Sequence, residues 1–344
     1  MRASVILRTR DEAARLRLTL ASLRAQSEEA ETVVVNDGSR DETDAVLSEA
    51  SRLAPLVRVD HDTAQGRSRA ANAGAERASG EILIFLDGDT LAGPDFVARH
   101  LALHRARAGL VARGETLHLR QTRLFSDPDA LTPMKGEEAR VLTMGAAERE
   151  RARIRAADVA ENFASIEARA QEGIYPGAGP RLLCQLEMAA LREAPGCAAL
   201  WAAASGSNQS VSREAFLEAG GFDAELSINE HRELALRLTQ AGLRMAAADG
   251  ARSFHMIHRS GWRDPLVETG WEARFYASHR LPEVALLAVL WASLSDAPAV
   301  PAPVRILSLP QLEEAARRCA GVIGLEAVRR AHFSACAEKG GAPG

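Results

Sequence analysis

The first ninety residues predict an α/β fold with a mostly parallel central sheet flanked by helices. Three short apolar segments are each followed by a segment with helical spacing, and a fourth apolar segment, 82–86, runs into Asp-Gly-Asp. This alternation is typical of parallel strands joined by right-handed helical crossovers. A nearly continuous apolar run bounded by a turn signal indicates that the fourth strand is central and buried.

The elements of this first part follow one another at short intervals. Runs of apolar and β-branched residues predict strands, and apolar residues three or four apart predict helices. The predicted strands are 3–9, 31–35, 56–59, 81–86 and 110–119, and the predicted helices lie near 12–23, 41–47, 66–78 and 94–103.

Beyond residue 120 the pattern is less regular. Polar, proline-bearing stretches and a charged helical run at 146–172 predict a helical insert over 120–200, lying over the ligand edge of the sheet. A C-terminal helical extension is expected at 261–344. The elements predicted for this part are strands at 200–204, 245–248 and 253–257, helices at 214–219, 230–241, 282–294 and 312–337, and a disordered tail from 340.

Composition and charge exclude several functional classes. The chain has 344 residues, a net charge of −4 and no basic footprint, so we expect no nucleic-acid partner. The four cysteines lack metal-ligand spacing and are expected to be thiols in a reducing compartment. The N-terminal apolar patch is too short for a signal peptide, and segment 284–294 has about half the length of a membrane span. We therefore expect a cytoplasmic protein, with 284–294 either buried in the core or in peripheral contact with the inner face of the membrane.

Two carboxylates follow the predicted central strand, at the edge of the sheet where ligands bind. Asp87 and Asp89 are separated by one glycine, and such a pair suits a hard divalent cation that carries a diphosphate. An acidic turn that begins the helix after Pro94 explains the same residues without a ligand. His255 and His258, near the end of the last predicted strand, can supply an imidazole to a metal or have only a structural role.

Other polar residues are expected near the same edge. Asp37 follows the second strand, and its Asn-Asp-Gly-Ser context is explained either by a ligand or by a turn that caps a helix. Neither GxGxxG nor GxxxxGK[ST] occurs, so we expect a metal and side chains to hold any diphosphate. Glu230 and His231 open a helix as candidates for a general base, or as a carboxylate that favours the helix dipole beside a surface histidine.

Together these segments resemble family 2 of the inverting, nucleotide-sugar-dependent glycosyltransferases, which have the GT-A fold. The motifs occur in order over 3–93 and 205–258. They are VILRTRDEAARLRLTLASLRAQ, VVVNDGSRDET, GRSRAANAG, ILIFLDGDT, SGSNQSVSREAFLEAGGFDAEL and NEHRELALRL. The resemblance implies a nucleotide-sugar-binding half at 1–119 and an acceptor-side half at 201–260, separated by the insert.

The resemblance also implies roles for single residues. The expected ligands for Mn²⁺ or Mg²⁺ are Asp89 and His258, the latter in preference to His255. The residues expected to contact the donor or substrate are Thr9, Arg10 and Asp37 at the nucleobase, Asp87 toward the ribose, and Asn72, Ser207 and Asn208. Arg67 or Arg69 is expected at the phosphate oxygens, and Arg69 is preferred.

Two departures from the family's motifs bear on function. Ala71 replaces the arginine of Ala-Arg-Asn, and His231 stands where the family has the aspartate that deprotonates the acceptor. Either His231 or Glu230 then receives the proton, or the acceptor is a thiol or an acidic group that needs less help from a base. Loss of transfer activity is a further interpretation.

We therefore predict a metal-dependent inverting glycosyltransferase that moves a sugar from a nucleotide-diphosphate sugar, a UDP-sugar first of all. The acceptor is left open among a glycan, a lipid-linked glycan, a peptide and a small molecule, and the sequence is compatible with a homodimer. The alternatives are a non-catalytic nucleotide-sugar-binding protein and a sugar nucleotidyltransferase. The latter is disfavoured because the loop at 8–12 has no glycine.

Overall fold

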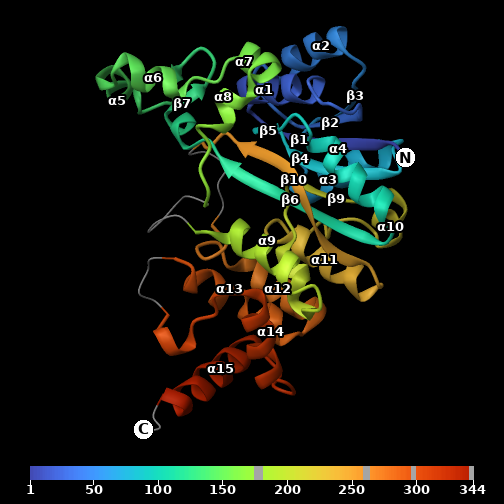
Figure 1. The fold of residues 1–344 in the computed structure, drawn as a ribbon, viewed down its shortest axis with the longest axis vertical. Helices are drawn as coiled ribbons and strands as arrows, with labels where there is room; N and C mark the ends of the chain where they lie inside the picture. The colour runs from blue at the N-terminus through green and yellow to red at the C-terminus, as the bar shows by residue number, and fades with distance from the viewer. Residues whose placement is uncertain (174–180, 259–263, 296–299, 341–344) are drawn as a thin grey trace.

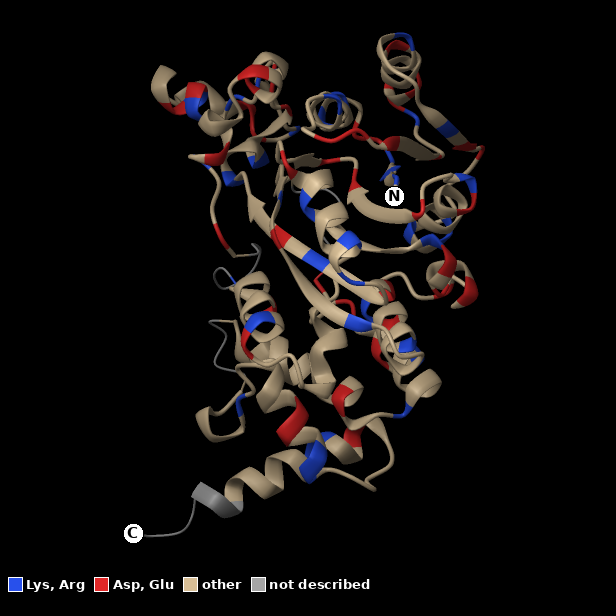
Figure 2. Cartoon of the chain, turned by 45° about the vertical axis from the view of Figure 1, so that its right-hand side comes forward, with Lys and Arg blue, Asp and Glu red and all other residues tan. Residues whose placement is uncertain are grey.

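The computed structural model describes residues 1–173, 181–258, 264–295 and 300–340 (Figure 1). The large sheet and the helices on its two faces form the upper part of the molecule in Figure 1, and the C-terminal helices lie below it. In Figure 2, acidic and basic residues are interspersed over the outer helices and loops.

Within the described ranges, the main sheet has eight strands in the order β3-β2-β1-β4-β9-β6-β10-β5. Strands β1 to β4 pair in parallel, as do β6 and β10, whereas β9 runs antiparallel to its neighbours β4 and β6, and β5 to β10. The strands are β1 Ala3–Thr9, β2 Glu31–Asp37, β3 Val57–His61, β4 Ile82–Asp87, β5 Thr90–Ala92, β6 Leu110–His118, β9 Gln209–Ser212 and β10 Arg244–His255. The predicted α/β class with a mostly parallel sheet is confirmed.

Helices cover both faces of this sheet because its central strands are apolar on both sides. Val5 and Leu7 of β1 pack with α1, α2 and α4, whereas Ile6 packs on the opposite face, where α3 lies. A Cβ at Gly74 of α3 would lie 2.6 Å from the Ile6 side chain, so glycine permits this close approach. The helices beside the sheet are α1 Ala13–Arg24, α2 Thr43–Leu53, α3 Arg67–Arg77, α4 Phe96–Ala106, α10 Arg213–Glu218 and α11 Glu230–Gln240.

The strand predicted at 200–204 is wrong. These residues belong to a 3₁₀ helix, η2 Ala198–Ala203, and the strand β9 follows it. A short apolar run does not distinguish a buried strand from a buried helical turn, and here the ring of Trp201 packs against Phe275. The strand β9 was not predicted, because its sequence, QSVS, is mostly polar and lacks the apolar run that indicates a buried strand.

Three further predictions about single elements need correction. The two closing strands at 245–248 and 253–257 form one strand, β10, with an irregularity between Ala247 and Arg252 where Gly250 has a positive φ. The helical run at 146–172 is three short helices, and the helix at 312–337 is two. They are α6 Ala146–Ala152, α7 Ala156–Glu161 and α8 Phe163–Glu167, and α14 Leu309–Arg318 and α15 Leu325–Gly340.

Several elements between and after these were not predicted. They lie in the polar part after β6 and in the lower part of the molecule. They are η1 Arg120–Leu124, β7 Phe125–Asp127, β8 Thr132–Pro133, α5 Glu138–Thr143, α9 Leu183–Glu193, α12 Gly270–His279 and η3 Ala302–Val304. Residues 120–200 lie in two places, because α5 to α8 are near α1 at the top of Figure 1 and α9 packs below the sheet.

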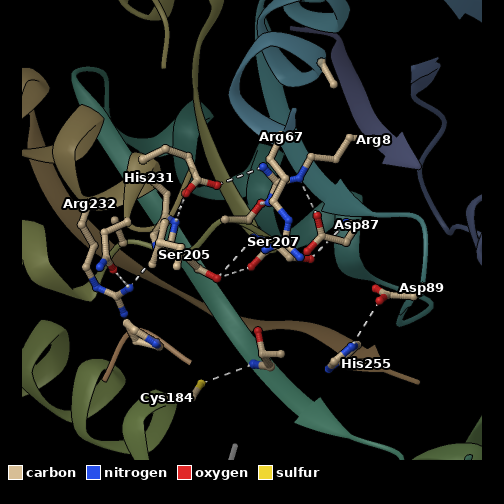
Figure 3. Close-up of a pocket in the computed structure, with 18 of the residues that line it drawn as sticks. Arg8, Arg67, Asp87, Asp89, Cys184, Ser205, Ser207, His231, Arg232 and His255 are labelled. Carbon is tan, nitrogen blue, oxygen red and sulfur yellow. Dashed lines mark hydrogen bonds and ion pairs between the residues drawn. The ribbon is translucent and has the colours of Figure 1, made fainter. Parts of the chain in front are cut away.

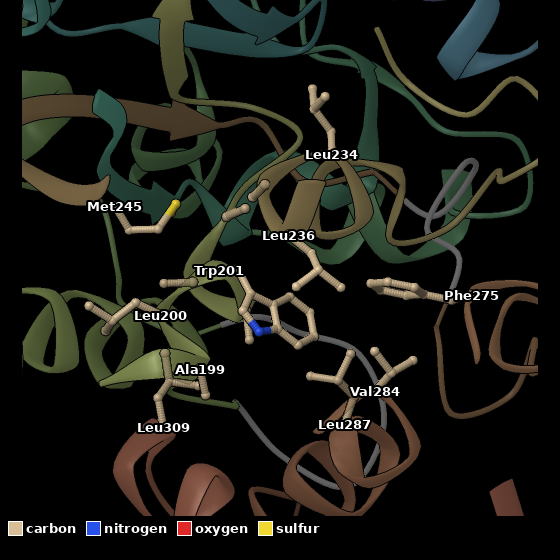
Figure 4. Packing of buried hydrophobic residues seen from close by; sticks show 14 of the residues in the cluster. Ala199, Leu200, Trp201, Leu234, Leu236, Met245, Phe275, Val284, Leu287 and Leu309 are labelled. Carbon is tan, nitrogen blue, oxygen red and sulfur yellow. The ribbon is translucent and has the colours of Figure 1, made fainter. Parts of the chain in front are cut away.

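The C-terminal helices share one hydrophobic core with the sheet side of the molecule. Val284 and Leu287 of α13 (Pro282–Ser293) lie close to Trp201 and to Leu236 of α11 (Figure 4). The expectation that 284–294 forms a buried core helix is confirmed for α13. No helix in the described part of the chain is long and apolar enough to cross a membrane. A disordered tail was predicted from residue 340, and its residues 341–344 lie outside the described part of the chain.

Two buried histidines of α4 are expected to make the fold sensitive to acid. His100 bonds to Asn208 (2.9 Å) and Ser210 (2.8 Å), and His104 bonds to Ser210 (2.8 Å). Burial lowers the pKa of His100 to about 3 and that of His104 to about 4. Because both values lie below the unfolded value of 6.5, the unfolded chain binds protons first, and stability falls as the pH drops below 6.5.

Between pH 7 and 5.5, each of these histidines is expected to remove roughly 1 kcal/mol from the free energy of unfolding. Urea unfolding followed by circular dichroism at the two pH values measures the loss. A His104→Gln variant should show a pH-dependent loss smaller by about that amount. An unchanged pH dependence in this variant would contradict the assignment.

Candidate active site

A cavity of about 700 Å³ opens at the carboxyl ends of the parallel strands (Figure 3). One wall of the cavity, which we call the donor-side wall, comes from the ends of β1, β2 and β4 and the start of α3. The floor of the cavity comes from β6, α9, the start of α11 and α13. The lining therefore combines the N-terminal strands with the C-terminal helix α13, which contributes Trp291.

One carboxylate and two imidazoles meet at one end of this cavity. Asp89 Oδ2 lies 2.8 Å from His258 Nε2 and 3.3 Å from His255 Nε2. The pairing of Thr90 with His255, together with the bond from Met256 N to the Asp89 carbonyl (3.0 Å), holds the two segments together. The two imidazoles outweigh burial, which alone would raise the pKa of Asp89, and hold that pKa well below its usual range.

These three side chains fit a divalent metal. Each offers one ligand atom, and the three atoms lie within 4.8 Å of one another. A carboxylate oxygen and imidazole nitrogens suit Mn²⁺ and later transition metals better than Mg²⁺, which prefers oxygen ligands. The sequence preferred His258 to His255, but the fold brings both to Asp89.

Arg8 is a central residue of the cavity that the sequence analysis missed. Its Nε donates to Asp87 Oδ1 (2.7 Å), its Nη1 donates to Glu230 Oε1 (3.0 Å), and its side chain is only 10% exposed. The two carboxylates outweigh burial and raise the pKa of Arg8. The sequence contained a signal for this residue, because Arg8 is a cation that directly follows the apolar run at 5–7 of a predicted strand.

The two candidate bases lie at the start of α11 and both contact arginines. Glu230 is 2% exposed, and its pKa is lowered because His231, Arg8 and Arg67 together outweigh burial. His231 Nε2 lies 2.7 Å from Arg232 Nη1, and its Nδ1 lies 3.6 Å from Glu230 Oε2. Burial, with the charges of Arg232 and Arg8, lowers the pKa of His231.

A buried ionic network forms the floor beside these residues. Glu187 of α9 accepts from Arg113 Nη2 (3.0 Å) through one oxygen and from Arg232 Nη2 (2.6 Å) through the other. Arg113 also donates to the Ala203 carbonyl, and the Arg232 guanidinium lies 5.1 Å from the ring centroid of Trp291. Two guanidinium groups therefore share one carboxylate at this end of the cavity.

Five of the residues expected to contact the donor or substrate line the cavity, namely Thr9, Arg10, Asp37, Asp87 and Ser207. The Asp37 carboxylate accepts from the backbone of Gln65 (2.7 Å) and Gly66 (2.9 Å), and Ser207 Oγ accepts from Asp87 N (3.2 Å). Their roles toward a ligand stay predictions.

Three other predicted contact residues lie outside the lining and are corrected here. Arg69 projects into solvent and pairs with Glu225 (2.6 Å), while Arg67, the first residue of α3, lines the cavity. Asn72 exchanges hydrogen bonds with the backbone of Phe222. The Asn208 side chain is fully buried and donates to the carbonyls of Glu115 and Ala251, so its role is structural.

Comparisons with known proteins agree with this arrangement. Residues 4–117 match the family model "Glycosyl transferase family 2". The chain is 36% identical over 116 residues to the uncharacterized glycosyltransferase YfnE of Bacillus subtilis, covering 33% of this chain and 30% of that one. It is 40% identical over 109 residues to a validoxylamine A glucosyltransferase of Streptomyces hygroscopicus, covering 30% and 26%. The chain thus spans under a third of the length of these curated relatives.

The fold has a counterpart among solved structures. The crystal structure of S. aureus TarS 1-349 superposes with a TM-score of 0.50 at 14% identity, covering 97% of this chain and 72% of that one. This likeness bears on the fold alone, and it confirms the predicted GT-A class. Over residues 4–117, the chain is similar to glycosyl transferase family 2.

Proposed function

We propose that this protein is a metal-dependent inverting glycosyltransferase that uses a nucleotide-diphosphate sugar, with UDP as the expected carrier. The observation that carries the proposal is the cluster of Asp89, His255 and His258 at the ligand edge of a family 2 domain. The cluster opens into a cavity large enough for a nucleotide sugar.

The residues of the donor-side wall define how the donor would bind. Asp37, with Thr9 and Arg10 beside it, lies at the strand ends where a nucleobase and ribose are expected. Arg67 opens α3 on the same wall and brings a cation toward the diphosphate. Asp89, His255 and His258 would hold Mn²⁺ or a similar cation, which neutralises charge on a leaving diphosphate.

The acceptor would enter from the opposite side, between α9, α11 and α13. A sugar placed between the donor-side wall and the floor exposes its anomeric carbon to the floor. Attack from that side, opposite the leaving diphosphate, inverts the configuration at this carbon in one displacement. The cytoplasmic location, the peripheral membrane contact and the homodimer stay predictions.

A thermal-shift experiment tests the donor site first. The protein is heated with UDP, GDP and dTDP and with their sugars, each with and without Mn²⁺. A ligand at about a hundred times its dissociation constant should add roughly 2.7 kcal/mol of stability. Release of the nucleoside diphosphate from the donor that binds then measures turnover.

The outcomes separate the candidate functions. A metal-dependent shift followed by turnover supports the transferase. Binding without turnover favours the non-catalytic nucleotide-sugar-binding protein, the alternative that the departures at His231 and Ala71 indicate. No shift with any nucleotide contradicts the donor site itself.

A further inference from the structure

We propose that the acceptor reacts as an oxyanion, the oxygen of a phosphate monoester or a carboxylate, so that no side chain has to remove a proton from it. This inference rests on the proposed transferase function and names the chemical class of its acceptor. It follows from the contacts of the two candidate bases and from the charge of the cavity floor.

Glu230 is engaged as the partner of a buried cation. Its Oε1 accepts from Arg8, whose Nε is held by Asp87, so the three groups form one chain across the cavity. A proton taken up by Glu230 would leave the buried guanidinium with half of its compensating charge. Removing one partner of a buried ion pair is costly, so Glu230 is a poor proton acceptor.

His231 has no acceptor nitrogen to spare. A neutral imidazole has one acceptor nitrogen, and a guanidinium can only donate, so the short contact with Arg232 uses the acceptor at Nε2. The other ring nitrogen then carries the proton. Arg232 is itself fixed by the Ala202 carbonyl (2.8 Å), Asn229 Oδ1 (3.0 Å) and Glu187 Oε1 (2.6 Å).

The remaining carboxylates that line the cavity in the described part of the chain are engaged or distant from the floor. Asp37, Asp87, Asp89 and Glu187 each have the partners given above. Asp11 accepts from Arg40 N (2.7 Å). Glu12 lies on the donor side, next to Thr9 and Gly88. None of these is placed to take a proton from an acceptor on the floor.

The floor also carries an excess of positive charge. Arg113 and Arg232 share the single carboxylate of Glu187, and all three side chains are less than 10% exposed. Glu230, at the start of α11 on the same floor, does not offset this charge, because its carboxylate is paired with Arg8 of the donor-side wall. A buried uncompensated cation is unfavourable, so an anion on the floor would be stabilised there.

The reaction then balances without a base. An oxygen of the anionic acceptor forms a bond to the anomeric carbon while the bond from that carbon to the diphosphate oxygen breaks. The electron pair leaves with the nucleoside diphosphate, which gains the negative charge that the acceptor loses. The product is a glycosyl phosphodiester from a phosphate monoester, or a glycosyl ester from a carboxylate, with inverted configuration.

The test compares three small acceptors with one chain length: octyl phosphate, octanoate and octanol. Each is incubated with the protein, Mn²⁺ and the donor found in the thermal-shift panel, and the product is identified by mass spectrometry. We expect transfer to octyl phosphate or octanoate at least about tenfold faster than to octanol, and the two anions distinguish a phosphate from a carboxylate source. The rate with the preferred anion should stay within about threefold from pH 7 to 9, because its oxygen is already ionised.

A second measurement follows binding in an Arg113→Gln variant. With UDP and Mn²⁺ bound, the dissociation constant of the preferred anion should rise at least tenfold, whereas that of UDP should stay unchanged. Faster transfer to octanol, or no binding of either anion to the UDP-loaded protein, overturns the inference and leaves the transferase function standing. Failure of every donor to bind overturns the function instead.

Discussion

An Asp89→Asn variant is expected to transfer sugar at least about 100-fold more slowly than the unmodified protein. Asparagine keeps the shape of the side chain but removes the negative charge that lies 2.8 Å from His258 and 3.3 Å from His255. A divalent cation at this site would lose its only carboxylate among these three ligands. The stabilisation of the leaving diphosphate would fall with the occupancy of the metal.

Nucleoside diphosphate release at saturating donor, measured over a range of Mn²⁺ concentrations, checks this expectation. The midpoint of the metal titration should move to higher Mn²⁺. Asp62→Asn, an exposed change on the loop after β3, serves as the matched control and should leave both quantities unchanged. An Asp89→Asn protein with the rate of the unmodified protein would show that the metal assignment is wrong.

A Glu187→Gln variant is expected to lower the free energy of unfolding by about 3–5 kcal/mol. Glu187 is 2% exposed on its side chain and is the carboxylate between the guanidinium groups of Arg113 and Arg232. A glutamine keeps one acceptor oxygen but removes the compensating charge for two buried cations. The loss is large because both guanidinium groups are then buried without that charge.

Urea unfolding measures the change, provided that the transition of the unmodified protein is two-state. Glu193→Gln, an exposed change near the end of the same helix, is the matched control and should alter stability by less than about 0.5 kcal/mol. A loss below about 1 kcal/mol for Glu187→Gln would mean that the network is well solvated. The assignment of a charged floor would then be wrong.

The candidate site could be predicted in part. The sequence placed Asp87 and Asp89 at the carboxyl edge because they directly follow an apolar strand, and both line the cavity. It chose Arg69 instead of Arg67 because helical spacing does not tell which of two nearby arginines turns toward a cavity. Asn72 and Asn208 are polar residues of matching motifs, and both serve the packing of the backbone.

By itself, the sequence determined the α/β class, the order of the first four strands along the chain and the carboxylates at their ends. These properties depend on apolar periodicity and turn residues, which act over a few neighbouring positions. Only the tertiary structure decided that Arg8 meets Glu230 across 222 positions, or that two histidines of the β10 end reach one aspartate. Such contacts are set by the pairing of distant strands and by the burial of charge, and no local pattern specifies them.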